Sequence, residues 1–245
     1  MATFNEQVVI LCGGRGTRLR ERTESIPKAL IEIGGVPILW HVISIYAAQG
    51  FERFLLCTGY KGEQIEEWAA ATTWPEGVRV DCVDTGLDTP TGGRLKLLED
   101  RIGEERFCAT YADGVADIDL EALLEVHGEG GALATVTVVQ PTLQFGIAEV
   151  GGDGRVRGFE EKPKLERWIN GGFFCFEPGA FSYLSENSVL EREPLERLAA
   201  DGELHAYRHE GFWDCMDTYK DAVLLNDLWE QGDPPWRVWS EEPVR

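Results

Sequence analysis

The feature that most restricts the fold is an apolar segment that ends in a run of glycines near the start of the chain. Gln7–Cys12 is a largely apolar, strand-like run, and Gly13-Gly14-Arg15-Gly16 follows it directly. A strand that breaks into glycines is typical of a β-strand leading into a turn, because glycine permits backbone conformations that other residues avoid. The rest of the chain must supply further strands to pair with this one and helices to cover it.

Strand-like and helical patterns alternate through the first half of the chain. Arg53–Thr58, Val78–Val83 and Phe107–Thr110 are apolar runs typical of strands. Helical patterns occur in Pro37–Gln49, Glu63–Ala71 and Asp119–His127, the last with Asp119 as a candidate N-cap. This alternation predicts an α/β fold with a mostly parallel sheet that is covered on both faces.

After Gly131 the pattern changes to shorter, β-rich segments. The turn at residues 151–154 predicts a hairpin of Gly146–Val150 and Val156–Glu160. Other predicted elements are the strands Ala132–Val139 and Gly172–Phe176 and the helices Pro194–Ala200 and Tyr219–Glu230. Because no linker or repeat interrupts the chain, we expect residues 1–245 to form one domain. Its first lobe would span about residues 1–131 and its second about residues 132–245.

The composition excludes several classes of function. The formal net charge is −20, which disfavours binding to nucleic acid or to an anionic membrane surface, since both require excess Lys and Arg. No segment approaches the ~18 consecutive apolar residues of a membrane-spanning helix. The six cysteines are dispersed and lack the spacing of a zinc site. With no secretory leader pattern at the start, these features predict a cytoplasmic protein with reduced thiols.

The glycine run has the chemistry of a phosphate-binding loop. Glycines let several backbone N–H groups point at one anion, and Arg18 and Lys28 add positive charge nearby. The Walker pattern is excluded because no Lys follows the glycines at the required position. The dinucleotide pattern is excluded because Leu19 stands where its third glycine belongs. A loop that binds no ligand is the plain alternative.

The segment Gly13-Gly14-Arg15-Gly16-Thr17-Arg18-Leu19, with Pro27-Lys28, resembles the signature of the sugar-1-phosphate nucleotidyltransferases. Further segments resemble the glucose-1-phosphate cytidylyltransferase branch, among them Thr91-Gly92-Gly93-Arg94, Tyr111-Ala112-Asp113-Gly114-Val115, Glu161-Lys162-Pro163, Asn170-Gly171-Gly172 and Glu191-Arg192-Glu193-Pro194-Leu195. The similarity spans roughly residues 7–236. It implies a Rossmann-like mixed, mostly parallel central sheet flanked by helices, with a smaller β-rich sugar-binding lobe.

The resemblance also implies a reaction. A sugar 1-phosphate, foremost glucose 1-phosphate, would attack the α-phosphorus of CTP and release pyrophosphate. The same chemistry with UTP, dTTP or another phosphorylated acceptor stays open, as does a non-catalytic regulatory protein that binds a nucleotide sugar. Asp113 and Asp217 are expected to hold Mg²⁺, because carboxylates and phosphate oxygens form a normal Mg²⁺ shell. The plain alternative for Asp217 is the N-cap of the helix that begins at Tyr219.

Individual roles follow from the matched positions. The residues expected at the nucleotide are Gly13, Gly14, Gly16, Thr17, Arg18, Lys28, Thr91, Gly92, Gly93 and Arg94, with Arg15 a weaker candidate. The residues expected at the sugar phosphate are Gly146, Glu161, Lys162 and Asn170. Arg18, Lys28, Asp113, Lys162 and Asp217 are expected to be catalytic. Gly92 and Gly93 would expose backbone groups that distinguish cytosine from uracil, and the family implies a homo-oligomer.

Three departures from the family pattern bear on these expectations. The stretch Ala69–Gly77 is shorter than the corresponding insertion in relatives, which leaves the oligomeric state open. Ala112 stands where the family has glycine before the metal-binding aspartate. Residues 141–147 also differ from the usual run beside the acceptor site, which leaves the identity of the acceptor open.

Overall fold

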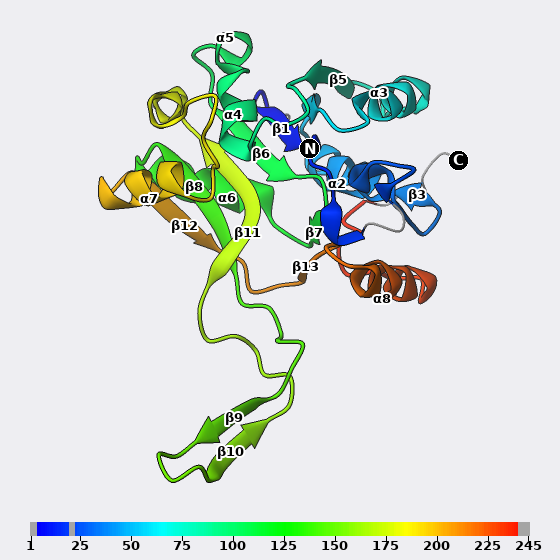
Figure 1. Cartoon of the computed structure of the whole chain (residues 1–245). Helices are drawn as coiled ribbons and strands as arrows, with labels where there is room; N and C mark the ends of the chain where they lie inside the picture. Colours follow the sequence, from blue (N-terminus) through cyan, green and yellow to red (C-terminus); the bar gives the residue numbers. More distant parts are fainter. Residues whose placement is uncertain (1–3, 20–22, 240–245) are drawn as a thin grey trace.

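The computed structural model describes residues 4–19 and 23–239. The strands of its central sheet are β1 (Gln7–Leu11), β4 (Arg53–Thr58), β5 (Arg79–Asp84), β6 (Phe107–Tyr111), β8 (Ala134–Val139), β11 (Ile169–Phe176) and β12 (Leu204–Arg208). They lie side by side in the order β12-β8-β11-β6-β1-β4-β5 (Figure 1). Strand β11 is antiparallel to β8 and β6, and the other neighbouring pairs are parallel. The predicted mixed, mostly parallel sheet is confirmed.

Successive side chains of each strand point to opposite sides of the sheet. Both faces therefore carry apolar side chains, and helices cover both. In β1, Val8 and Ile10 belong to one apolar core and Val9 to the other. The first core includes side chains of α2 (Ile38–Ala47), α3 (Gly62–Ala71), α6 (Leu120–Gly130) and α8 (Tyr219–Glu230). The second includes those of α4 (Thr91–Lys96), α5 (Glu99–Ile102), η3 (Pro178–Tyr183) and α7 (Glu193–Ala200).

The N-caps of α6 and α8 test two predictions made from the sequence, one for Asp119 and one for Asp217. The Asp119 side chain accepts a hydrogen bond from the Ala122 N–H and caps α6, as predicted. At α8 the cap is Thr218, whose hydroxyl and the Asp221 carboxylate form a capping box. The plain alternative for Asp217, that it caps this helix, is therefore wrong.

Several short elements escaped the sequence patterns. They are α4, α5, β2 (Glu32–Ile33), β3 (Val36–Pro37), β7 (Gly114–Ala116), β13 (Trp213–Cys215) and the 3-10 turns η1 (Thr17–Leu19) and η2 (Lys28–Leu30). Helix α4 was hidden by its sequence, because Thr91-Gly92-Gly93 has poor helix propensity. Strands β7 and β13 pair outside the main sheet and are too short to show a period of two.

The predicted hairpin exists and extends away from the sheet as a separate arm (Figure 1). It consists of β9 (Ile147–Val150) and β10 (Val156–Glu160). Apolar side chains along it are exposed, with Phe145 81% and Phe159 68% accessible. The other strands of the predicted second lobe, β8, β11 and β12, belong to the same sheet as those of the first. The division into two lobes stays a prediction.

A buried histidine shows how the aromatic residues complete the core. His41 is fully buried in α2, and its Nε2 lies 2.9 Å from the Ile33 carbonyl oxygen. Burial lowers the pKa of His41 to about 4, so the ring is neutral at pH 7. Trp229 and Trp236 pack against it. His41 is therefore a neutral residue of the core.

Candidate active site

Three charged side chains meet beyond the end of β6. Lys28 lies in η2, Asp113 in the turn between β6 and β7, and Asp217 between β13 and α8. The Lys28 ammonium donates to Asp113 Oδ2 and, over 2.7 Å, to Asp217 Oδ1. Their side chains are between 17% and 38% exposed, so solvent screens the interaction less than at an open surface. The structure thus brings together three residues that the sequence singled out.

The short β7–β13 pair determines where Asp217 lies. Cys215 is opposite Gly114 in this antiparallel pair, and the Met216 N–H donates to the Asp113 carbonyl oxygen over 2.9 Å. The backbone before Asp217 is therefore tied to the residue that carries the other carboxylate. Ala112 does not have a positive φ, so alanine fits at the position where the family has glycine.

The electrostatics of this cluster follow from two carboxylates and one ammonium. Burial lowers the pKa of Lys28, but the charges and hydrogen bonds of Asp113 and Asp217 outweigh it and raise that pKa above its usual value. Burial and the same two carboxylates raise the pKa of the neighbouring Cys215 thiol to about 12. The cluster therefore keeps an excess of negative charge and favours an added cation.

The same carboxylates are the residues that could hold a divalent metal. Both Asp113 and Asp217 reach one cationic group, Lys28 Nζ, so their oxygens can also converge on a metal ion. Within residues 4–19 and 23–239, no group of three or more His, Cys, Asp or Glu side chains forms a metal site. Two carboxylates suit Mg²⁺, which takes its remaining ligands from phosphate oxygens and water.

The glycine loop lies between β1 and η1. Gly14 and Thr17 are exposed, and Gly16 has a φ of +58°, a conformation that favours glycine. Gly13 is buried, and its carbonyl oxygen accepts hydrogen bonds from the Tyr60 N–H over 3.1 Å and from Arg94 Nη2 over 3.0 Å. The side chain of Arg18 lies outside the described part of the structure, so its predicted role is not placed.

Arg94 corrects one prediction. Its side chain is buried, with 4% exposed, and its guanidinium donates to the Thr58 carbonyl oxygen over 2.8 Å and to Thr85 Oγ1 over 2.6 Å, besides Gly13. The residue was expected to contact the nucleotide because residues 91–94 resemble the family segment that faces the base and the nucleotide. Instead, its planar fork braces the glycine loop against the ends of β4 and β5.

Gly93 requires a second correction, whereas the role predicted for Gly92 stays a prediction. The Gly93 N–H donates to the Ser188 carbonyl oxygen over 3.0 Å, so it is not available to distinguish one base from another. A Cβ atom on Gly93 would lie 2.1 Å from the Glu186 carbonyl oxygen, and one on Gly92 would lie 2.9 Å from Ser188 Cβ. These glycines allow residues 186–190 to pack directly on α4.

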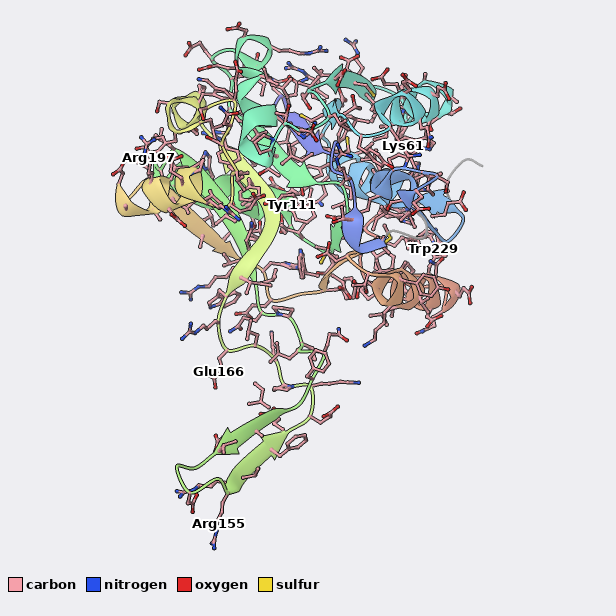
Figure 2. The ribbon with its side chains drawn as sticks, viewed as in Figure 1. Lys61, Tyr111, Arg155, Glu166, Arg197 and Trp229 are labelled. Atoms are coloured by element: carbon pink, nitrogen blue, oxygen red, sulfur yellow. The ribbon has the colours of Figure 1, made fainter. Side chains whose placement is uncertain are left out.

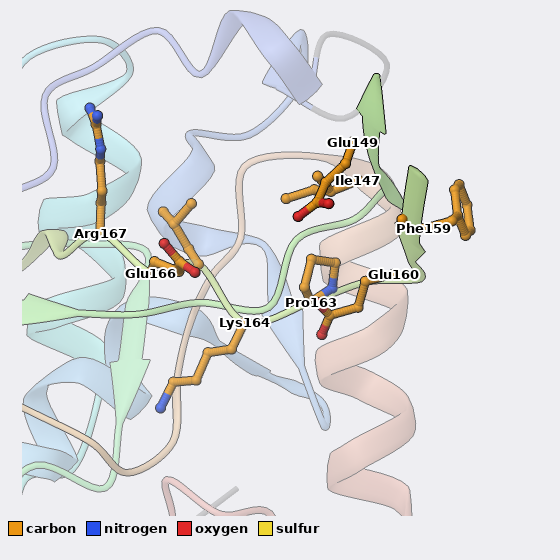
Figure 3. Close-up of a pocket in the computed structure, with 10 residues that line it drawn as sticks. Ile147, Glu149, Phe159, Glu160, Pro163, Lys164, Glu166 and Arg167 are labelled. Carbon is orange, nitrogen blue, oxygen red and sulfur yellow. The ribbon is translucent and has the colours of Figure 1, made fainter. Parts of the chain in front are cut away.

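Of the residues predicted for the sugar phosphate, Gly146, Glu161 and Lys162 lie around the base of the arm, whereas Asn170 lies in β11 of the main sheet. A Cβ atom on Gly146 would lie 2.8 Å from Glu161 Oε2, so these two residues are neighbours. Lys162 is exposed and has a φ of +50°. A cavity of about 490 Å³ lies beside them, and its lining includes Glu160 and Lys164 (Figure 3).

Tyr111 and Glu191 connect Asn170 with Thr91, and the sequence reasoning gave neither of them a role. The Tyr111 hydroxyl donates to Glu191 Oε1 over 2.6 Å and accepts from Asn170 Nδ2, which is 3.1 Å away. Thr91 Oγ1 donates to Glu191 Oε2 over 2.7 Å. Burial and the Glu191 carboxylate raise the pKa of Tyr111 well above its usual value. Tyr111 lies at the sheet, whereas Glu166 marks the start of the arm (Figure 2).

Comparison with known proteins identifies similar chains. The nucleotidyl transferase family profile matches residues 7–221. A probable glucose-1-phosphate cytidylyltransferase of Bacillus subtilis (strain 168) is 44% identical over 95% of this chain and 100% of its own length. The glucose-1-phosphate cytidylyltransferase of Salmonella typhimurium is 42% identical over 96% of this chain and 100% of its own.

Solved structures show the same fold. HddC from Yersinia pseudotuberculosis has a TM-score of 0.73 at 22% identity and covers 91% of this chain and 99% of its own. A UDP-glucose pyrophosphorylase from Acinetobacter baumanii has a TM-score of 0.73 at 18% identity, over 95% of this chain and 96% of its own. At these identities the likeness concerns the fold alone.

The role of Arg94 can be tested by Arg94→Lys. Lysine keeps the charge but loses the fork, so the hydrogen bonds from Arg94 to Gly13, Thr58 and Thr85 are lost, while the Gly13 and Thr58 carbonyl oxygens keep their backbone donors. We expect the free energy of unfolding in urea to fall by about 3 kcal/mol. Arg101→Lys, at an exposed arginine that pairs with Asp81, should change it by less than about 0.5 kcal/mol. Equal effects of both substitutions would show that Arg94 does not brace the loop.

Proposed function

The chain belongs to the nucleotidyl transferase family, and we propose that it transfers CMP from CTP to glucose 1-phosphate, giving CDP-glucose and pyrophosphate. The observation that carries this proposal is the convergence of Lys28, Asp113 and Asp217 beside the glycine loop, in a chain 42–44% identical to two cytidylyltransferases. CTP and a sugar 1-phosphate are the partners that such a site requires.

The proposed reaction is an in-line displacement between two anions. An oxygen of the sugar phosphate attacks the α-phosphorus of CTP, a new P–O bond forms, and the bond to the β-phosphate oxygen breaks. The protein must neutralise charge and align the reactants, and no covalent protein intermediate is needed. Lys28 supplies a fixed positive charge for the triphosphate, and Gly14 and Thr17 offer the exposed surface of the loop.

Asp113 and Asp217 would hold a divalent cation, which we propose to be Mg²⁺. When bound, Mg²⁺ neutralises phosphate charge and orients phosphate oxygens. The two carboxylates carry more negative charge than Lys28 balances, which supports this assignment.

The acceptor would be bound by residues from the sheet and from the arm. We propose that the Lys162 ammonium binds the phosphate of glucose 1-phosphate, because it is exposed at the base of the arm. Glu161 and Asn170 would contact sugar hydroxyls, with Gly146 leaving room for the ring beside Glu161. Arg18, whose side chain is outside the described part, is retained as a phosphate-binding residue by its place in the loop.

Two alternatives are kept apart by specific observations. The same reaction with UTP, dTTP or another phosphorylated acceptor would use the same cluster, and the choice of substrate alone distinguishes it. A non-catalytic regulatory protein would not need the metal carboxylates and the phosphate cation together. Their presence in one cluster favours an enzyme.

A cytoplasmic location is part of the proposal. All six cysteines are unpaired thiols in the structure, as expected in a reducing compartment. Detection of the protein in an exported fraction of its cells would contradict this. Among the described residues, no helix is both long and apolar enough to cross a membrane.

We expect a homo-oligomer that covers the arm. Val150 and Val156, a cross-strand pair on the arm, are 65% and 60% exposed, and burying them against a second copy removes apolar surface from water. Light scattering should give at least twice the single-chain mass of 27.4 kDa, and Val150→Glu with Val156→Glu should shift it toward one chain. A single-chain mass for the unmodified protein at micromolar concentration would refute the expectation.

The base preference is tested by pyrophosphate release with Mg²⁺ and glucose 1-phosphate from CTP, UTP, dTTP, ATP and GTP. We expect kcat/KM for CTP to exceed that for every other nucleotide by about tenfold or more. Asp113→Asn should lower turnover at least about a hundredfold because it removes a proposed metal ligand, whereas Asp100→Asn, at an exposed position of α5, should not. Preference for another nucleotide would refute the cytidylyl assignment.

Lys162→Ala tests the acceptor site. Loss of the ammonium should raise KM for glucose 1-phosphate by about tenfold or more, with a much smaller change in KM for CTP. The control is Arg101→Ala, an exposed cation of α5 that pairs with Asp81, which should leave both values nearly unchanged. Equal increases for both substrates would place Lys162 outside the acceptor site.

A further inference from the structure

Glu191 connects three segments that are distant in the chain. Its Oε1 accepts from the hydroxyl of Tyr111, the last residue of β6, and its Oε2 accepts from the hydroxyl of Thr91, the first residue of α4. Thr91 lies 100 positions and Tyr111 80 positions from Glu191. The reaction proposed above assigns Glu191 no task.

The chemistry of a carboxylate sets the direction of every hydrogen bond in this network. An ionised carboxylate can only accept, so Tyr111 must donate to Glu191. The lone pairs of the Tyr111 oxygen then accept from Asn170 Nδ2 over 3.1 Å. Asn170 Oδ1 in turn accepts from the Gly172 N–H over 2.9 Å. The amide of Asn170 is thereby held in one of its two flipped orientations.

The other side of Glu191 is fixed in the same manner. Thr91 Oγ1 accepts from the Leu190 N–H over 2.9 Å, which leaves its hydroxyl hydrogen for Glu191. Residues 186–190 reach this place because Gly92 and Gly93 leave room for them on α4. The two glycines expected to face the base therefore deliver Glu191 to the site.

We propose that Glu191 is a positioning residue that orients Asn170 through Tyr111 for binding the acceptor sugar. This inference rests on the proposed function, since it gives a task to the same acceptor site. With Nδ2 turned to Tyr111, Asn170 retains one N–H with which to donate to a sugar hydroxyl. Tyr111 also lies two residues before Asp113. The network therefore connects Asn170 to the strand that leads to a proposed metal ligand.

The network is located where it can affect binding more than stability. Glu191 and Asn170 are both exposed, and hydrogen bonds that exchange with water contribute little to the free energy of unfolding. A purely structural role would therefore leave the kinetics unchanged. An orienting role changes the KM of the acceptor while the protein stays folded.

The test uses steady-state kinetics of Glu191→Ala, Tyr111→Phe and the double variant, with Glu193→Ala as the matched control. Glu193 is also exposed and bonded, but to Arg197 over 2.9 Å on α7. We expect Glu191→Ala to raise KM for glucose 1-phosphate about tenfold with less than about a threefold change for CTP. Tyr111→Phe should have a similar effect, and the double variant should add little, because both break one connection.

Two further measurements complete the test. Glu191→Gln keeps an acceptor oxygen for Tyr111, so its acceptor KM should lie closer to that of the unmodified protein than the alanine variant's. The side-chain amide resonances of Asn170 should shift in Glu191→Ala and not in Glu193→Ala, a readout that needs no turnover. The inference would be overturned if the KM increase of the double variant equalled the product of the two single increases. Unchanged Asn170 resonances in Glu191→Ala would overturn it as well. Inactivity of the unmodified protein with CTP and glucose 1-phosphate would instead refute the proposed function.

Discussion

The ion pair of Lys28 with Asp113 and Asp217 is the interaction on which the arrangement of the site depends. Two carboxylates that contact the same ammonium group would repel each other if that cation were absent. The fold supplies that cation from η2 and supplies the second carboxylate through the β7–β13 pair. Because the two carboxylates outnumber the one ammonium, a phosphate at this cluster would require an added cation, which is the role we propose for Mg²⁺.

The parts of the fold that were predicted are those with a local cause. Helix α8 runs from Tyr219 to Glu230 as its pattern indicated, and Asp119 caps α6 because an acidic side chain before an apolar period is a local signal. Lys28 and Asp113 were each expected at the site because both belong to motifs, but the motifs did not predict the ion pair between them. By contrast, whether Arg94 points to a ligand or into the protein depends on Thr58 and Thr85, and no local pattern encodes that.

Glu191 is a second case in which the local sequence does not reveal the role of a residue. The motif that contains it was recognised, but its task depends on hydroxyl groups far away in the sequence and on the direction of their hydrogen bonds. The same holds for Gly92 and Gly93. A glycine pair signals a close approach of something, and here it is the chain's own residues 186–190 that approach. For the Gly93 N–H, sequence reasoning therefore found the close approach but not its partner, Ser188.

In our proposal the arm takes part both in binding the acceptor and in assembly with a second copy. Glu161 and Lys162 lie at its base, whereas Asn170 is anchored at the sheet through Tyr111. An acceptor bound by both would span a rigid part, held by the seven-stranded sheet, and a part that the sheet does not support. The arm also exposes Val150, Val156 and Phe159 to solvent. A second copy that buries these side chains would fix the arm, so in our proposal assembly and acceptor binding depend on the same hairpin.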